Sequence, residues 1–243
     1  MTAGAAIRQA LAFLSSVVPL EGAPTPEALS WFPAVGIAIG GAEGALWRSA
    51  CRRWPPLPAA ALIVGADVAL TGALHLDGLA DTVDGLFAHD PSKDRRSIMA
   101  DPNIGTFGAV ALGLAIVGRT AALSAADASP LLLAALACGS RSVMAAAIGF
   151  LPYALETGLV SAFASSDGRS RGRRAGLAGL GIALALGALA ARRRGVLAVG
   201  SGALAAGAVL VVGQQRLGGY TGDVLGAAGT TFEVVGLLSA ARC

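Results

Sequence analysis

Long apolar stretches recur along almost the whole chain, and they constrain its fold more than any other feature. A helix needs about 20 mostly apolar residues to cross the hydrocarbon core of a bilayer. The candidate stretches are Trp31–Trp47, Ala59–Leu76, Gly105–Ala125, Pro130–Phe150, Gly176–Ala191, Gly195–Gly213 and Val224–Ala240. The first and the fifth are short. The pattern therefore predicts an all-α fold, a polytopic transmembrane helical bundle with six or seven spans.

The composition agrees with a membrane protein. Only 14% of the residues are charged and 55% are hydrophobic, whereas soluble domains carry about 25% charged residues. The 34 glycines suit close contact between helices in lipid. Because we find neither a soluble domain boundary nor a clear internal repeat, we expect residues 1–243 to form a single integral membrane domain.

Residues 1–30 precede the first predicted span and contain a short apolar run, Leu11–Leu20. Such a run is similar to the core of a signal peptide. It ends in Pro19 and Glu21, however, and Pro24 follows the only small-residue cleavage point. We therefore expect a retained segment that lies in the membrane interface or re-enters the membrane.

The basic residues of this chain, whose formal net charge is +3, are clustered in loops. With seven spans, nine Lys and Arg residues fall on the side of the loops 77–103 and 156–174, and seven fall on the other side. This small bias predicts that residues 77–103 form a cytoplasmic active-site segment. We assign the basic charge to topology, lipid headgroups and an anionic substrate, and we expect no nucleic acid partner.

Three aspartates lie close together in "LHLDGLADTVDGLF", residues 74–87. At about 100° per residue, a helix would place Asp77, Asp81 and Asp84 within an arc of roughly 60°. Carboxylates on one face repel each other, and a hard divalent cation such as Mg²⁺, which takes one or two carboxylates plus substrate phosphates, would neutralise them. The alternative is a solvated acidic helix end or an N-cap cluster, which is more costly beside lipid.

Cysteine and histidine offer no competing metal site. The chain has three cysteines without metal-binding spacing and only two histidines. The inventory excludes a multi-histidine centre and indicates neither a zinc site nor a disulfide framework.

A turn followed by a helix is predicted in "IMADPNIGTFGAVAL", residues 98–112. Asp101, Pro102 and Asn103 form the turn, and Gly105 and Gly108 open the helix. The free N–H groups of this helix end could face a phosphate. The spacing alone favours a simple capped helix start instead.

Two arginines, Arg119 and Arg141, fall inside predicted spans. An ionisable group at that depth normally faces a cavity or a partner, and arginine suits bidentate binding of phosphate. The alternative is an ion pair with an acid such as Asp67 or Asp127. For Arg119 both interpretations stay open, whereas for Arg141 we favour a functional role.

A glycine-rich segment, "LGGYTGDVLGAAGTTFE", runs from residue 217 to residue 233. Gly218, Gly219 and Gly222 permit a close approach of the backbone to a ligand, and Asp223 could complete a metal site or act as a base. A glycine-rich turn capped by Asp223 is the alternative, and the spacing leaves both open.

Three of these segments together resemble the cobalamin-5′-phosphate synthase family, adenosylcobinamide-GDP ribazoletransferase. They are "HLDGLADTVDGLF", "IMADPNIGTFG" and "GGYTGDVLGA" with the later Glu233, and "FPAVGIAIGG" resembles the first span of that family. The resemblance implies a multi-pass enzyme of the prokaryotic cell (inner) membrane. It would join adenosylcobinamide-GDP to α-ribazole or its 5′-phosphate, with Mg²⁺, and release GMP. An oligomer is compatible with the sequence.

Motif by motif, the resemblance carries over Asp77, Asp81, Asp84, Asp101, Gly105, Thr221 and Asp223. Together with the residue chemistry described above, it predicts the following site residues. The metal ligands are Asp77, Asp81 and Asp84, and the catalytic residues are Asp84, Asp223 and Arg141. The substrate-binding residues are Lys93, Arg95, Arg96, Asp101, Asn103, Gly105, Thr106, Gly219 and Thr221. Many members have Asp-Ser-Arg where this chain has Asp101-Pro102-Asn103, so we expect Lys93, Arg95 or Arg96 to replace the missing arginine. Asp67 matches no family feature.

Two other functions share part of this pattern. A CDP-alcohol phosphotransferase also binds magnesium at a membrane-edge aspartate cluster, but this chain has Asp81 where its motif requires arginine, and the final aspartate pair is absent. A cation-coupled secondary transporter could use Arg119, Arg141 and Asp67 along a pathway, but the two related halves frequent in transporters are not found. Release of GMP distinguishes the enzyme from the transporter.

Overall fold

The structure of the chain, a computed structural model, describes residues 2–88, 94–126 and 129–241. Its elements are α1 (Ala3–Leu14), η1 (Pro26–Trp31), α2 (Phe32–Ala50), α3 (Pro56–Thr71), α4 (Leu74–Phe87), α5 (Arg95–Met99), α6 (Thr106–Ala125), α7 (Pro130–Phe150), η2 (Leu159–Phe163), α8 (Ser166–Leu217) and α9 (Gly222–Ala240). In the described residues, an isolated bridge between Tyr153 and Tyr220 is the only β pairing. The all-α prediction is confirmed.

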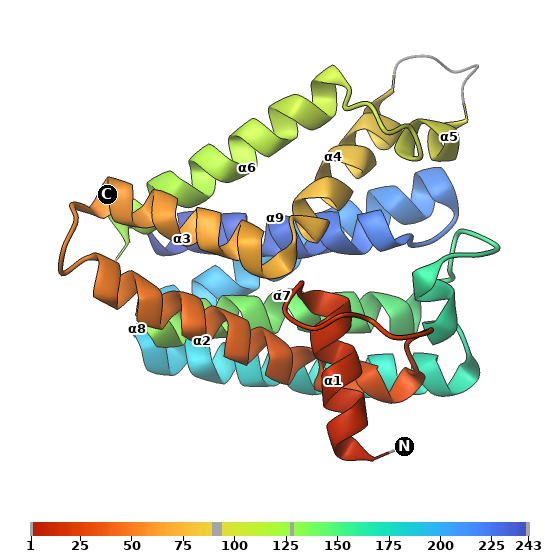
Figure 1. The fold of residues 1–243 in the computed structure, drawn as a ribbon, viewed down its shortest axis with the longest axis horizontal. Coiled ribbons are helices and arrows are strands. Elements are labelled where there is room, and N and C mark those ends of the chain that lie inside the picture. The colour runs from red at the N-terminus through yellow and green to blue at the C-terminus, as the bar shows by residue number, and fades with distance from the viewer. Residues whose placement is uncertain (1, 89–93, 127–128, 242–243) are drawn as a thin grey trace.

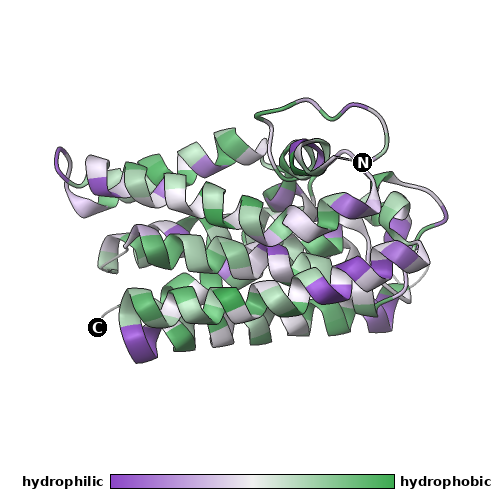
Figure 2. Ribbon diagram, turned by 90° about the horizontal axis from the view of Figure 1, so that it is seen from below, coloured by the Kyte–Doolittle hydropathy of each residue, from purple (hydrophilic) through white to green (hydrophobic). Residues whose placement is uncertain are grey.

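The helix α7 occupies the centre of the bundle and is buried along most of its length. It packs against α2, α8 and α9. A helix that is apolar all round must be covered on every side or face lipid. Figure 2 shows apolar residues along the long helices and hydrophilic residues mostly towards the helix ends. This distribution suits a bundle that crosses a membrane.

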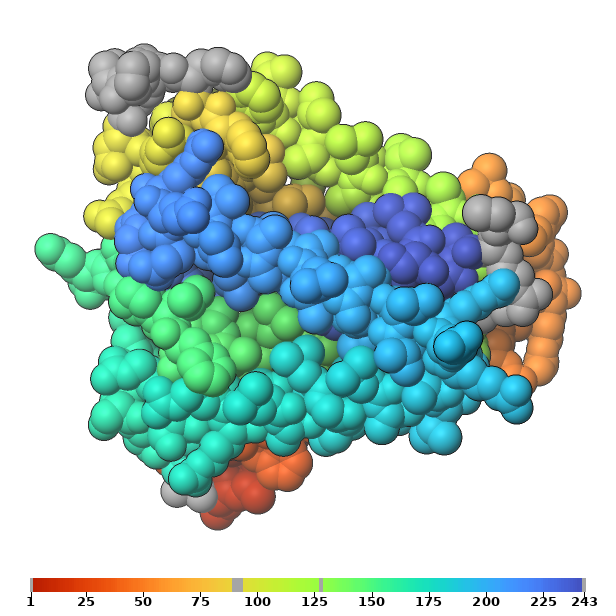
Figure 3. Space-filling view, turned by 180° about the vertical axis from the view of Figure 1, so that it is seen from behind, coloured from red at the N-terminus to blue at the C-terminus, as the bar shows by residue number. Residues whose placement is uncertain are grey.

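The long helix α8 is in fact a helical hairpin. Its dihedral angles leave the helical region at Ala191 (φ −147°, ψ 23°) and Arg192 (φ 49°, ψ −127°). The chain reverses there, so that Gly187 lies against Gly195 and Val199, and Figure 3 shows the two arms side by side. The two predicted spans, Gly176–Ala191 and Gly195–Gly213, correspond to these arms.

The predicted span Ala59–Leu76 is not one straight helix, and here the prediction is wrong. The helix α3 ends at Thr71, Gly72 and Ala73 both adopt left-handed dihedral angles, and α4 continues after a bend of 90°. Gly72 is a usual residue for this type of helix end. Ser16 stabilises the bend, since its side chain donates a hydrogen bond of 2.7 Å to the carbonyl oxygen of Ala69.

The number of crossings agrees with the prediction. Five helices of the described residues are long and apolar enough to span a membrane, and the bent pair α3–α4 also qualifies. Counting the two arms of α8 separately gives six or seven. The loops 151–165 and 218–221 lie at the same end of the bundle as α5 and the end of α4, while the turns after α2 and α6 lie at the opposite end (Figure 1).

The N-terminal helix α1 lies crosswise to the bundle (Figure 1) and contacts η1 and α2. Its buried residues are Ala6, Ala10 and Leu14. This arrangement suits the expected interfacial segment, and its position in the membrane stays a prediction.

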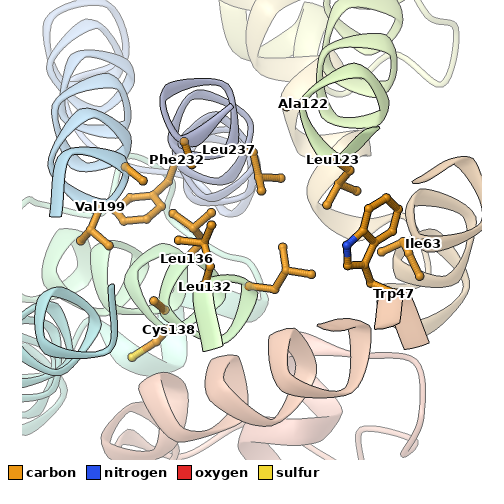
Figure 4. Close-up of a cluster of buried hydrophobic side chains, with 14 of the residues drawn as sticks. Trp47, Ile63, Ala122, Leu123, Leu132, Leu136, Cys138, Val199, Phe232 and Leu237 are labelled. Carbon is orange, nitrogen blue, oxygen red and sulfur yellow. The ribbon is translucent and has the colours of Figure 1, made fainter. Parts of the chain in front are cut away.

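The core depends on glycines that let helices approach closely. In the cluster of Figure 4, Phe232 of α9 and Leu136 of α7 pack together with Val199. A Cβ at Gly139 would overlap with the ring of Phe232. On the other face of α7, a Cβ at Gly40 of α2 would overlap with the carbonyl oxygen of Leu133. Small residues at such contacts are typical of membrane helices.

The neighbouring glycines Gly40 and Gly41 allow a matched test of this packing. Gly40→Ala should lower the free energy of unfolding by about 1–3 kcal/mol, because the added methyl group overpacks the α2–α7 contact. Gly41→Ala should not, since a Cβ there meets nothing within 4 Å. Thermal unfolding in detergent measures both, and equal losses for the two variants would contradict the packing described.

Candidate active site

The predicted acidic helix is confirmed as α4, and it packs against the start of α9. The two helices touch at Gly78, where a Cβ would lie 2.8 Å from the backbone carbonyl oxygen of Asp223. The carboxylate of Asp81 is repelled by those of Asp77, Asp84 and Asp223. Segments about 140 residues apart in the sequence thus contribute carboxylates to one cluster.

Asp84 has a defined structural partner. Its Oδ2 accepts a hydrogen bond of 2.8 Å from the N–H of Gly105, and its Oδ1 accepts one of 2.8 Å from the N–H of Gly108. A side chain at either glycine would overlap with this carboxylate. Asp84 therefore caps α6 from a different helix, and its charge is favourable at that helix end. The capped helix start is the interpretation that the structure supports for Gly105.

The other three carboxylates differ in exposure and partners. Asp77 is exposed, whereas Asp81 and Asp223 are half-buried. The hydroxyl of Thr221 lies 3.4 Å from Oδ2 of Asp223 and accepts a hydrogen bond of 3.2 Å from the N–H of Val224. Thr221, predicted to bind substrate, is thus the buried N-cap of α9.

The side chains of this cluster have the right chemistry for Mg²⁺, but their positions limit how many can bind one ion. Its side-chain donors are carboxylate oxygens, which a hard cation prefers. Within the described ranges, however, no three His, Cys, Asp or Glu side chains are close enough to bind one ion together. Two carboxylates with substrate phosphates and water form the usual Mg²⁺ site, and Asp77 and Asp81 fit that pattern.

The predicted phosphate-binding arginines contact backbone carbonyls beside this cluster. Arg95 donates to the carbonyl oxygens of Gly85 and Leu86 at the end of α4, at 2.9 and 2.7 Å. Arg96 donates to that of Leu217 at the end of α8, at 2.9 Å. Both arginines therefore fasten α5 next to the acidic helix. Lys93 lies outside the described residues.

One arginine at this helix end was not among the predicted site residues. Arg216 donates to the carbonyl oxygen of Leu86 and lies over the ring of Phe87, 5.4 Å from its centre. The sequence shows it only as a loop cation, and its partners become visible only when the ends of α4 and α8 meet.

The turn after α5 forms as predicted. Oδ1 of Asp101 accepts hydrogen bonds from the backbone N–H and the side-chain amide of Asn103, at 2.9 and 2.8 Å. Asn103 and Thr106 are exposed at this end of the bundle, where a substrate could reach them.

The late glycines build the turn between α8 and α9. Gly218 adopts a left-handed conformation (φ 82°) and ends α8. A Cβ at Gly219 would overlap with the carbonyl oxygen of Pro152. Gly219, predicted to bind substrate, is therefore in contact with the 151–155 segment. Gly222 is exposed, and its Cβ would have room, 3.4 Å from Val160.

A buried network of charges lies deeper in the bundle, with one residue from each of five helices. Arg119 contacts Asp67 at 2.6 Å, Glu43 at 2.9 Å and Glu233 at 3.2 Å, and Glu233 also pairs with Arg141. The ion pair is thus the interpretation that holds for Arg119. It also explains Asp67. Glu43 was missed, although a single acid inside an apolar stretch is a usable signal.

Arg141 is enclosed by this network. Only 2% of it is exposed, and its guanidinium contacts Glu233 and, at 3.3 Å, the hydroxyl of Ser140. A cavity of about 20 Å³ borders Arg141, Arg119 and His75, which is room for about one water molecule. A diphosphate does not reach Arg141 in this arrangement, so its catalytic role stays a prediction.

Removing the central cation of this network should be costly. Arg119→Met should lower the free energy of unfolding by about 3–5 kcal/mol, since it leaves buried carboxylates unpaired. Arg8→Met is the control, because it breaks an exposed ion pair with Glu21 of 2.8 Å and should change the unfolding temperature little. Equal effects of the two substitutions would show that the network does not hold the helices.

Comparison with known proteins identifies relatives of this chain. The profile of the cobalamin-5-phosphate synthase family matches residues 6–241. Three relatives are named adenosylcobinamide-GDP ribazoletransferase. That of Chlorobium phaeobacteroides is 35% identical over 233 residues, which are 90% of this chain and 91% of the relative. That of Bradyrhizobium diazoefficiens is 36% identical, over 86% and 80%, and that of Escherichia coli is 37% identical, over 86% and 85%.

No solved structure matches the chain. The family profile covers nearly all of the sequence, and parts of the three motifs meet at α4, where Gly105 contacts Asp84 and Asp223 contacts Gly78. This chain therefore belongs to the cobalamin-5-phosphate synthase family.

Proposed function

We propose that this protein is a Mg²⁺-dependent adenosylcobinamide-GDP ribazoletransferase of the prokaryotic cell (inner) membrane, with its active site on the cytoplasmic side. It joins adenosylcobinamide-GDP to α-ribazole or its 5′-phosphate and releases GMP, late in cobalamin biosynthesis. Family membership supports this activity. The observation that carries the site is the contact at Gly78, which brings the aspartates of the first and the last motif together.

The reaction breaks the phosphoanhydride bond of the diphosphate and forms a new phosphate ester bond. A hydroxyl oxygen of the ribose of α-ribazole attacks the phosphorus that bears the cobinamide. The bond from that phosphorus to the oxygen of GMP breaks, and GMP leaves with that oxygen. The hydroxyl proton passes to a carboxylate of the enzyme. Bound Mg²⁺ would neutralise the diphosphate and stabilise the departing GMP.

The surroundings of each aspartate suggest its role. Asp77 and Asp81 would hold Mg²⁺, since they are the carboxylates of α4 that do not cap α6. Asp223 would accept the proton, because it faces the same cluster from α9. The sequence predicts Asp84 for both roles, but its bonds to Gly105 and Gly108 favour a positioning role, in which it fixes α4 against α6.

The phosphates of the donor would meet the basic residues of α5. A guanidinium has five N–H donors, so Arg96, which is exposed, has capacity for phosphate in addition to its bond to Leu217. We propose Arg96, with Arg95 and Lys93, as the replacement for the arginine that the Asp101–Asn103 turn does not supply.

Release of GMP tests the reaction class. The purified protein, mixed in detergent or bilayers with α-ribazole phosphate, adenosylcobinamide-GDP and Mg²⁺, should release one GMP per corrinoid product. A chelator should stop the reaction and added Mg²⁺ should restore it, because the diphosphate charge must be neutralised. Absence of GMP in the complete mixture would refute the enzyme and favour a transporter.

Two isosteric substitutions separate the proton acceptor from the cap. Asp223→Asn should lower kcat about 10²–10⁴-fold, because the base is lost, while the unfolding temperature stays near that of the wild type. Asp84→Asn should lower the free energy of unfolding by about 0.5–2 kcal/mol, since its amide cannot accept from both N–H groups of α6. The opposite pattern would assign the base to Asp84.

A further inference from the structure

A partly open cavity lies directly beside the proposed proton acceptor. Its volume is about 270 Å³, and it lies between the start of α4, α7, the 153–160 segment and the start of α9. Asp223 and Gly222 form part of its wall. We propose that this cavity holds the dimethylbenzimidazole base of the acceptor nucleoside, an assignment that rests on the proposed function and extends it.

The position of the cavity supports this assignment. If Asp223 accepts a proton from the ribose, the ribose must lie within hydrogen-bond distance of that carboxylate. The base is attached to the same ribose, so it must occupy space next to Asp223. Gly222 and Gly226, which carry no side chains, line the cavity beside Asp223 and leave room next to that carboxylate.

The size of the cavity limits what it can hold. Pockets for drug-sized ligands measure about 300–1,000 Å³, and this cavity is slightly smaller. It cannot enclose the corrinoid, which is many times larger than one base. A single bicyclic base is the part of either substrate that suits it best.

The chemistry of the lining favours an apolar aromatic base over guanine. Among its described lining residues, only His75, Tyr153 and Asp223 carry polar side chains. Tyr153 is a neutral phenol, and burial and the nearby charge of Asp223 raise its pKa further. The many polar groups of guanine would be left without partners here, at a cost in free energy, whereas dimethylbenzimidazole has no exocyclic polar group.

Aromatic side chains line one part of the cavity. The rings of Phe13 and Phe32 stack with their centres 5.5 Å apart, and both border the cavity together with Tyr153. A flat base gains from offset or edge contacts with such rings. An acyl chain of a lipid would gain from burial here but not from this ring geometry, and this alternative is one outcome of the test below.

Binding of the free base, 5,6-dimethylbenzimidazole, tests the assignment without turnover. Equilibrium dialysis of the full-length protein should show saturable binding. Leu155→Trp, which fills the cavity from the loop, and Val160→Phe, which fills it from η2, should each weaken binding at least tenfold. Leu177→Trp is the control, because Leu177 lies outside the cavity and is 60% exposed, and it should bind like the wild type.

Turnover of the same variants distinguishes a failure of the cavity assignment from a failure of the proposed function. The filled variants should raise the KM for α-ribazole at least tenfold and leave the KM for adenosylcobinamide-GDP unchanged. Normal GMP release together with base binding that filling does not weaken would overturn the cavity assignment alone. The cavity assignment would also be overturned if a lipid co-purified with the wild type, was lost only from the filled variants and was not displaced by the base. Absence of GMP release from the wild type would instead refute the proposed function.

Discussion

The arrangement of the bundle depends on one buried cation, Arg119, and the acids around it. Its contacts with Glu43, Asp67 and Glu233 connect α6 with α2, α3 and α9, and Glu233 connects these with α7 through Arg141. A buried charge is costly unless it is paired, so the helices cannot slide or rotate freely without separating these pairs.

This network lies at a fixed distance along α9 from the acidic cluster, where the reaction is proposed to occur. Glu233 follows Asp223 by ten residues on α9, which corresponds to about 15 Å at 1.5 Å per residue. Arg141, whose guanidinium contacts Glu233, is therefore remote from the acidic cluster along this helix. Its effect on the reaction would act through the placement of α9, and thereby of Asp223, against α4.

Much of the fold was predictable, because a long apolar stretch has few alternatives to a helix. Pro130–Phe150 was predicted with the boundaries that α7 has, since Pro130 and the polar residues around it delimit the stretch. The bend at Gly72 and Ala73 was not, because residues 59–76 are apolar on both sides of it. Gly72 is a local signal for a helix end, but the stabilising hydrogen bond from Ser16, a residue of another segment, is not visible in any local pattern.

The site was predictable where residues share one helix and not where partners come from elsewhere. Helical spacing placed Asp77, Asp81 and Asp84 on one face. It could not show that Asp84 would meet the N–H groups of Gly105 and Gly108, because that contact forms only when α6 packs on α4. Asp67 was only one of the possible partners of Arg119, and the contact between the two shows which of the open interpretations holds.

The repulsion between these carboxylates is relieved to a different extent at each of them. Asp84 is neutralised by the start of α6, and Asp77 is exposed to solvent. Asp81 is half-buried, and the charges that act on it are those of Asp77, Asp84 and Asp223. It is therefore the carboxylate with most to gain from a divalent cation, and the diphosphate needs the same cation. The proposed Mg²⁺ would neutralise both Asp81 and the diphosphate. Mg²⁺ bound to the acidic cluster should therefore strengthen binding of the donor, and the bound donor should strengthen binding of Mg²⁺.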